Sequence, residues 1–207
     1  MKVFGITGWK NSGKTTLVTR LVSLMSGYGL RVSTIKHVHC GFDIDHPGTD
    51  SYRHREAGAE QVLLASGQRW ALMNEIRAES EAELDELLAE LSPVDIVIVE
   101  GFKMGNQPKI QVVRPQYNTG RLSGDVQPIV AIASNEKVNP ADYDCDGPLL
   151  PLDNVEAIAD FILDYCGLTR PARPNWTKPG PPPVDMWPAK FPKKRVADLS
   201  CDGMNSL

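Results

Sequence analysis

The sequence predicts an α/β fold in which a mostly parallel sheet carries helices on both of its faces. Short apolar runs alternate with helical patterns along residues 1–167 of the 207-residue chain. The runs are apolar throughout, which is typical of strands that are buried on both faces, and strands alternating with helices usually pair in parallel. The first run also leads directly into a glycine-containing loop and then an amphipathic helix.

The individual elements follow from local patterns. We expect strands where apolar residues run together, at 3–7, 31–38, 95–99, 110–113 and 129–133. Helices are expected at 14–26, 51–59, 79–91 and 155–165. Capping patterns mark the starts of the last two helices, formed by Ser80 with Glu83 and by Asp153 with Glu156. A hairpin is expected where two apolar runs flank a short polar turn, at 61–65 and 70–73.

Composition excludes several classes of protein. The formal net charge is −4, which argues against a nucleic-acid binder that works through a broad basic face. No apolar run approaches the roughly 18 residues of a membrane span. The first residues lack the apolar core of a signal peptide, and the four cysteines form no C-x-x-C pair. We therefore expect a cytoplasmic protein with reduced thiols.

The last 40 residues differ from the rest. Eight of the 16 prolines lie in 168–207, together with seven Lys/Arg and three Asp/Glu. Proline lacks an amide donor and fixes φ, so this segment forms neither a regular helix nor a central strand. We predict a folded domain at 1–167 and a proline-rich, disordered extension at 168–207.

The strongest motif is Gly8-Trp9-Lys10-Asn11-Ser12-Gly13-Lys14-Thr15, which matches G-x-x-x-x-G-K-[ST] at every fixed position. Such a loop turns its backbone N–H groups toward phosphate oxygens, and the following helix adds its positive N-terminal end. Lys14 is expected to reach the β- and γ-phosphates, and the Thr15 hydroxyl to bind Mg²⁺. The fold is therefore predicted to be P-loop NTPase-like, with phosphate contacts from Gly8, Asn11, Ser12, Gly13, Lys14 and Thr15.

Two later strands supply further candidates. Glu100 leaves the strand at 95–99 on its carboxyl end, so we assign it to the metal side, directly or through water. Lys103 is expected to face the phosphates or a second ligand. Asn135 follows the strand at 129–133 and is the candidate base-reading residue. It offers one acceptor where an aspartate would pair both guanine N1–H and N2–H₂, which weakens the expected preference for guanine.

All four histidines lie in one stretch, residues 37–54. We favour a substrate-binding loop near the nucleotide, with Lys36, His37 and Arg53 as donors and Asp45 near Mg²⁺. Asp50 is a further candidate in this loop or a cap of the short helix, and Arg69 either binds anions or serves solubility. An ordinary surface loop and a transition-metal site that includes His37, His39 and Cys40 are the alternatives.

The residues together resemble the molybdopterin-guanine dinucleotide biosynthesis adapter family, MobB. The matching segments span nearly all of 1–167 in order: GWKNSGKTTL, IKHVHC, DIDHPGTDSYRHREAGA, ASGQRWALM, DIVIVEGFK, AIAS and LDNVEAIADFI. The resemblance implies a GTP-binding P-loop protein with weak GTPase activity that works as a dimer beside the guanylyltransferase that joins GMP to molybdopterin. It places Thr16 among the phosphate-binding residues and molybdopterin among the possible ligands. The family often has Asp at position 135, and its compact domain has no counterpart of 168–207.

Two other functions share the phosphate loop. A small-molecule kinase uses the same cradle, but no Arg-rich lid stands out in the sequence. Steady phosphoryl transfer to a small molecule would favour that function. A metal-insertion GTPase is the other alternative, and nickel or zinc bound by the histidine-rich loop would favour it.

Overall fold

The computed structural model describes residues 1–38, 41–76, 81–116, 122, 126 and 128–170. They fall into two compact units, one within 1–39 and 83–170 and the other within 40–82. The sequence predicts one domain over 1–167, because no change of composition marks 40–82 as separate. Of the extension at 168–207, only 168–170 is described, so its predicted disorder falls outside the described residues.

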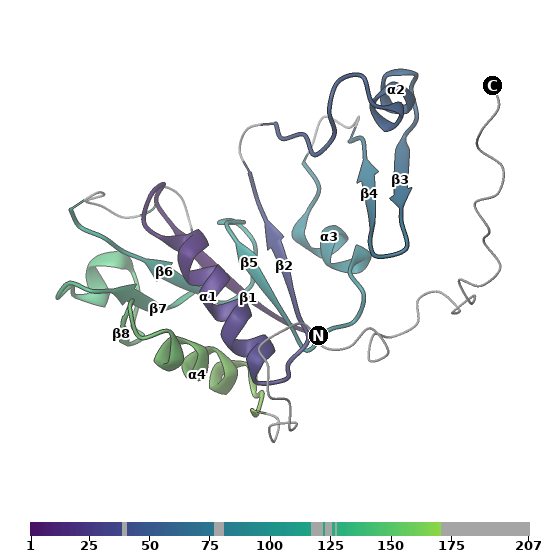
Figure 1. The fold of residues 1–207 in the computed structure, drawn as a ribbon. Coiled ribbons are helices and arrows are strands. Elements are labelled where there is room, and N and C mark those ends of the chain that lie inside the picture. Colours follow the sequence, from purple (N-terminus) through teal and green to yellow (C-terminus); the bar gives the residue numbers. More distant parts are fainter. Residues whose placement is uncertain (39–40, 77–80, 117–121, 123–125, 127, 171–207) are drawn as a thin grey trace, which may run out of the picture. The chain divides into compact units, whose positions relative to one another are not determined.

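The first unit is built on a six-stranded sheet in which every pair of neighbours is parallel (Figure 1). Its order is β2-β5-β1-β6-β7-β8. The strands are β1 (Lys2–Gly8), β2 (Val32–Lys36), β5 (Ile96–Glu100), β6 (Lys109–Val112), β7 (Ile129–Ser134) and β8 (Leu149–Pro151). All but β8 were predicted; β8 is only three residues long and ends in proline, too short for a pattern to stand out.

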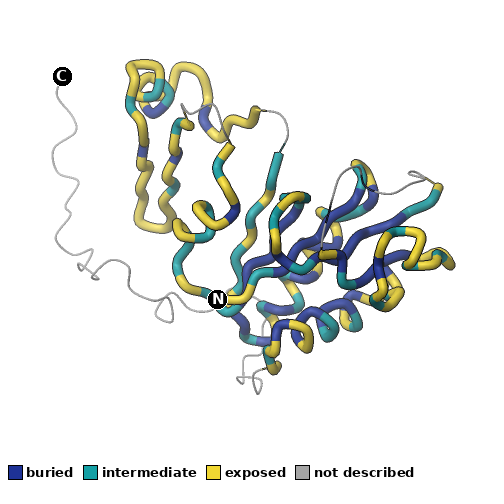
Figure 2. Tube along the Cα trace, turned by 180° about the vertical axis from the view of Figure 1, so that it is seen from behind, coloured by how far each residue is buried: buried dark blue, intermediate teal, exposed yellow. Residues whose placement is uncertain are grey.

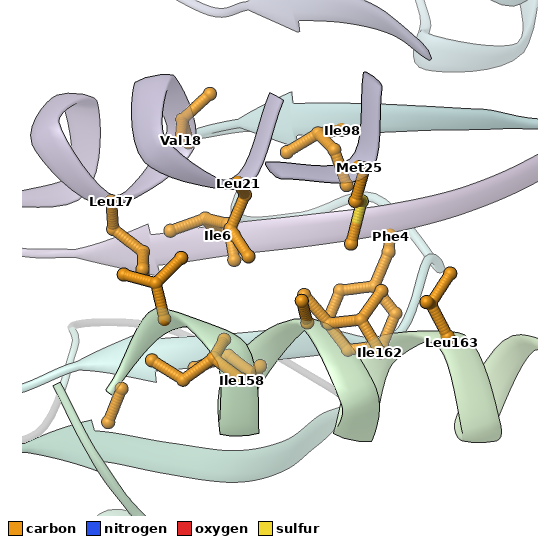
Figure 3. Close-up of a cluster of buried hydrophobic side chains, with 14 of the residues drawn as sticks. Phe4, Ile6, Leu17, Val18, Leu21, Met25, Ile98, Ile158, Ile162 and Leu163 are labelled. Atoms are coloured by element: carbon orange, nitrogen blue, oxygen red, sulfur yellow. The ribbon is translucent and has the colours of Figure 1, made fainter. Parts of the chain in front are cut away.

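Helices cover both faces of this sheet. Successive side chains of a strand point to opposite sides, so strands that are apolar throughout present an apolar surface on each face. On one face, α1 (Lys14–Gly27) and α4 (Val155–Cys166) pack over Phe4 and Ile6 of β1, as Figure 3 shows for Leu21, Ile158 and their neighbours. On the other face, Leu84 and Leu88 of α3 (Leu84–Glu90) pack with Val97 and Val99 of β5. A short 3₁₀ helix, Pro140–Tyr143, lies between β7 and β8 and contributes Tyr143 to a third apolar cluster. The predicted α/β fold is confirmed.

Two helix starts differ from the prediction. Helix α3 begins at Leu84, where Glu83 N donates to the Glu86 carboxylate at 2.9 Å, so the predicted start at residue 79 is wrong. The predicted cap Ser80 lies outside the described residues. Helix α4 is capped by Asn154, whose Oδ1 accepts from Ala157 N at 3.0 Å, so Asp153 is not the cap. Both sequences contain adjacent polar residues, and spacing alone does not decide which one caps.

The second unit contains α2 (Asp50–Glu56) and the predicted hairpin, which is confirmed as the antiparallel pair β3 (Gln61–Ala65) and β4 (Trp70–Asn74). In the turn, Ser66 Oγ accepts from the backbone N–H groups of Gln68 and Arg69 at 3.3 and 3.2 Å. Val62 and Met73 face each other and are buried, whereas most of the hairpin is exposed (Figure 2). No helix within the described residues is long and apolar enough to cross a membrane.

Candidate nucleotide-binding site

The loop between β1 and α1 is a tight turn that requires glycine at its first position. Gly8 has φ 147°, and a Cβ there would lie 2.6 Å from Val112 O and 2.8 Å from Ser12 Oγ. Asn11 and Gly13 also have positive φ, 65° and 98°. No side chain from the described residues caps the start of α1 at Gly13. The first N–H groups of this helix are therefore placed to bind an anion.

Lys14, Thr15 and Glu100 meet at the carboxyl edge of the sheet. β1 pairs with β5 so that Ile6 lies opposite Glu100, which brings the end of β5 beside the loop. Thr15 Oγ1 donates to Glu100 Oε1 at 2.6 Å, and Lys14 Nζ donates to Trp9 O at 2.6 Å. A hydroxyl and a carboxylate in contact form the hard oxygen set that Mg²⁺ prefers, so the residues present fit this ion.

Two more ammonium groups, those of Lys36 and Lys103, lie near Lys14 and Glu100. Lys36 Nζ lies 3.6 Å from Glu100 Oε1, and Lys103 Nζ lies 5.4 Å from the centre of the Trp9 ring. Burial lowers the pKa of Lys14; Glu100 raises it, and the charges of Lys103 and Lys36 lower it further. Three cations around one buried carboxylate leave an excess of positive charge, which is the electrostatics expected of a polyanion site.

The end of β5 is fixed against the end of β2. Gly101 and Phe102 have φ 92° and 47°, and a Cβ on Gly101 would lie 3.1 Å from His37 Cβ. His37 N donates to Glu100 O at 2.9 Å, and the His37 and Phe102 ring centres are 4.6 Å apart. A positive φ at a residue such as Phe102 is uncommon and concentrates at functional sites. The structure thus holds the predicted donor His37 next to the predicted metal-side residue.

Arg114 is a candidate that the sequence analysis missed. It follows β6, and its Nη2 lies 3.4 Å from where a Cβ on Gly13 would be. Four buried polar atoms in this neighbourhood have no hydrogen-bond partner among the described residues: Thr7 Oγ1, Ser12 Oγ, Gln111 Nε2 and Arg114 Nε. Only the strand order places Arg114 beside the loop, and the strand order is not written in the local pattern.

Asn135, the predicted base-reading residue, is joined to Asp153. Asn135 Nδ2 donates to Asp153 Oδ2 at 2.7 Å, and Asp153 N donates to Asn135 Oδ1 at 3.1 Å. Both residues are exposed. Both ends of the Asn135 amide are therefore engaged within the protein.

The remaining predicted residues, Asp45, Asp50, Arg53 and Arg69, belong to the second unit, which is described by itself. Asp45 Oδ1 accepts from Thr49 Oγ1 at 2.8 Å and from Ser51 Oγ at 2.9 Å. Burial works to raise the pKa of Asp45, but these bonds and that from His46 N lower it below its usual value.

The charges near α2 are paired within the second unit. Asp50 and Arg53 are exposed, and Arg53 Nη1 lies 3.8 Å from Asp50 Oδ1. Thr49 caps the helix, because its side chain accepts from Tyr52 N. Within the described residues, no group of three or more His, Cys, Asp or Glu side chains is placed to hold a metal ion. His39 and Cys40 of the transition-metal alternative lie outside those residues.

Fold and site together define a P-loop nucleotide-binding protein. The model of the family MobB, described as molybdopterin guanine dinucleotide synthesis protein B, matches residues 3–135. The chain belongs to this family, as the resemblance predicted.

Relatives and solved structures agree. The chain is 36% identical over 168 residues to the molybdopterin-guanine dinucleotide biosynthesis adapter protein of Escherichia coli (strain K12), covering 79% of this chain and 92% of the relative. It is 39% identical over 165 residues to the protein of the same name from Haemophilus influenzae, covering 79% and 88%. The crystal structure of molybdopterin-guanine biosynthesis protein B superposes with a TM-score of 0.60 at 29% identity, covering 80% of this chain and 99% of that one.

Proposed function

We propose that the protein is a GTP-binding adapter that assists the guanylyltransferase of molybdopterin guanine dinucleotide synthesis. Family membership supports the adapter role in this biosynthesis. The observation that carries the nucleotide part is the contact between Thr15 Oγ1 and Glu100 Oε1 at the mouth of the loop, beside Lys14. We expect the protein to work in the cytoplasm.

The chain's own groups account for triphosphate binding. N–H groups of Gly13, Lys14 and Thr15 lie at the start of α1, where the helix favours negative charge. Lys14 exchanges its bond to Trp9 O for the β- and γ-phosphates. Mg²⁺, when bound, supplies positive charge between phosphates and protein, held by Thr15 and, directly or through water, by Glu100. Asn11, Ser12 and Thr16 complete the surroundings of the phosphates.

Hydrolysis of GTP is expected to be slow. Glu100 contacts Thr15 and Lys36 and is assigned to the Mg²⁺ side, so it is not the residue that would orient the attacking water molecule. The sequence shows no obvious water-orienting glutamine of the kind that fast GTPases use, and Gln111, the glutamine near the loop, is buried in β6. The proposed activity is therefore weak and consistent with an adapter rather than an enzyme of high turnover.

The second anionic ligand, proposed to be molybdopterin, would meet Lys36, His37 and Lys103. These residues lie at the ends of β2 and β5, in the same unit as the phosphate loop. For Asp50, Arg53 and Arg69, which belong to the second unit, substrate binding stays a prediction. The phosphate of molybdopterin is an anion, so cations and ring N–H donors are the groups that would recognise it.

A homodimer is proposed on the apolar surface of the hairpin. Four of its large apolar side chains are substantially exposed: Leu63 by 55%, Leu64 by 44%, Trp70 by 52% and Leu72 by 39%. Exposed apolar side chains gathered on one element are typical of an interface between proteins. A second copy of the chain would remove them from water.

The decisive experiment is a GTP titration of wild type and Lys14→Ala. Loss of one member of a charge pair in a partly buried site costs about 2–5 kcal/mol, so the affinity of Lys14→Ala is expected to fall at least about 30-fold. Lys2→Ala, at the opposite end of β1, is the matched control and is expected to bind like wild type. Equal affinities of Lys14→Ala and wild type would refute the proposed function.

A further inference from the structure

The loops that follow β7 and β8 are tied together by a reciprocal pair of hydrogen bonds between Asn135 and Asp153. All six strands are parallel, so both loops lie at the same edge of the sheet as the phosphate loop. In open sheets of this kind, ligands bind outside the carboxyl ends of the strands. The pair therefore lies on the binding edge of the sheet.

The pair lies on the side of β1 away from the metal-side residue. In the sheet order, β5 with Glu100 is one neighbour of β1, and β6, β7 and β8 follow on the other side. Neighbouring strands are about 4.8 Å apart, which places β7 roughly 10 Å and β8 roughly 14 Å from β1. A nucleotide whose phosphates occupy the loop and whose metal lies toward Glu100 extends its base across β6 toward these two loops.

The backbone on both sides of the Asp153 side chain is fixed while its carboxylate remains in water. Leu152 N donates to Ser134 O at 3.2 Å, and Arg20 Nη2 donates to Asp153 O at 3.3 Å. Asn154 caps α4. No described residue donates to Oδ1 of Asp153, and Asn135 Nδ2 sets the orientation of the carboxylate through Oδ2. A carboxylate held in this way is a ready acceptor.

We propose that Asp153 is the residue that selects guanine and that Asn135 acts as its positioning residue; this rests on the proposed binding of GTP. Two carboxylate oxygens accept from the N1–H and N2–H₂ groups of guanine together, as Asn135 with its single acceptor does not. Adenine has an acceptor at N1 and no amino group at C2, so it gains neither bond. The family often has an aspartate at position 135, after β7. Here we assign the corresponding carboxylate to Asp153, after β8.

The test is a set of titrations of wild type and Asp153→Asn with GTP, ATP and xanthosine triphosphate. Xanthine carries a carbonyl where guanine has its amino group, so an amide at 153 accepts from N1–H and donates to that carbonyl. We expect Asp153→Asn to lose about tenfold to a hundredfold in GTP affinity and to prefer xanthosine triphosphate, while ATP binding stays unchanged. Asp146→Asn, an exposed carboxylate that precedes β8 and so lies at the other edge of the sheet, is the control and keeps the wild-type order.

The other outcomes separate this proposal from the proposed function. An unchanged preference for GTP in Asp153→Asn, with wild-type GTP binding intact, overturns the role of Asp153 and leaves the phosphate site standing. An equal loss of all three nucleotides also overturns it, because a base-reading residue acts on the base alone. Wild type that binds none of the three refutes the proposed function itself. Asn135→Ala is expected to reduce the discrimination between GTP and ATP without reaching the preference for xanthosine triphosphate.

Discussion

The two units of this chain bury the residues of their strands to very different extents. In the six-stranded sheet every residue of β5 is buried, and Ile96, Val97, Ile98 and Val99 are completely inaccessible. In the hairpin, by contrast, β3 buries only Val62 of its five residues, and β4 buries only Met73. The sheet is a core that fixes the phosphate loop by itself, whereas the hairpin leaves apolar surface that a partner would cover.

The largest expected effect is a difference between the two units in the free energy of unfolding that is lost when an apolar side chain is truncated. Ile158→Ala removes a fully buried side chain between α4 and the sheet and is expected to lower the free energy of unfolding by about 2–5 kcal/mol. Leu63→Ala, at an exposed position of the hairpin, is expected to cost less than about 1 kcal/mol in dilute protein. Urea denaturation at low protein concentration measures both, and equal costs would contradict the contrast.

A buried lysine makes the free energy of unfolding of the first unit depend on pH. Lys109 is completely inaccessible, its Nζ donates to Gly105 O and to Gln107 O at 3.0 Å, and burial lowers its pKa to about 8. The unfolded chain therefore binds more protons than the folded one between about pH 8 and the ordinary value of 10.5, so stability rises with pH across this window.

The rise due to Lys109 is at most about 3 kcal/mol. Lys109→Met is expected to lack it, and the difference between the two pH profiles of the unfolding free energy isolates the contribution. The exposed Lys137→Met serves as the control. A wild-type profile parallel to that of Lys109→Met would show that the ammonium keeps its ordinary pKa.

A charge placed on the exposed apolar surface of the hairpin is expected to weaken the proposed dimer. Trp70→Glu places a carboxylate in the exposed apolar surface and is expected to weaken dimer formation about tenfold or more, because the charge would be desolvated in the interface. Gln68→Glu adds the same charge in the adjoining turn and is the matched control. Sedimentation over a range of concentrations reports both, and a wild type that stays monomeric throughout would remove the hairpin from the interface.

Local patterns predicted most elements and the residues at the centre of the candidate site. The runs around β1 and β5 are long and apolar, and the motif at residues 8–15 fixes Lys14 and Thr15; the expected position of Glu100 at a strand end needed only that β5 be parallel to β1. Asn135 with Asp153, and Arg114 with Gly13, could not be found in this way. Each of these pairs depends on which strands are neighbours in the sheet, and that order arises from long-range packing.

The loop before α2 shows why the role of a single polar residue is hard to predict from sequence. Asp45 has the chemistry of a metal ligand, but three hydrogen bonds to its Oδ1 hold the turn that leads into the helix. Arg55 binds Asp43 and Glu75 at 2.8 and 2.6 Å in the same unit. A polar side chain that organises a loop and one that binds a ligand look alike in sequence, because both require the same donors and acceptors.

The joint action of Thr15 and Glu100 on Mg²⁺ is best tested by titrating GTP with Mg²⁺ and after chelation. We expect Mg²⁺ to tighten GTP binding of wild type about tenfold or more, and this gain to vanish in both Thr15→Ala and Glu100→Gln. Thr19→Ala, one turn along α1, should keep it. A gain that survives in both variants, or wild type indifferent to Mg²⁺, would contradict the account.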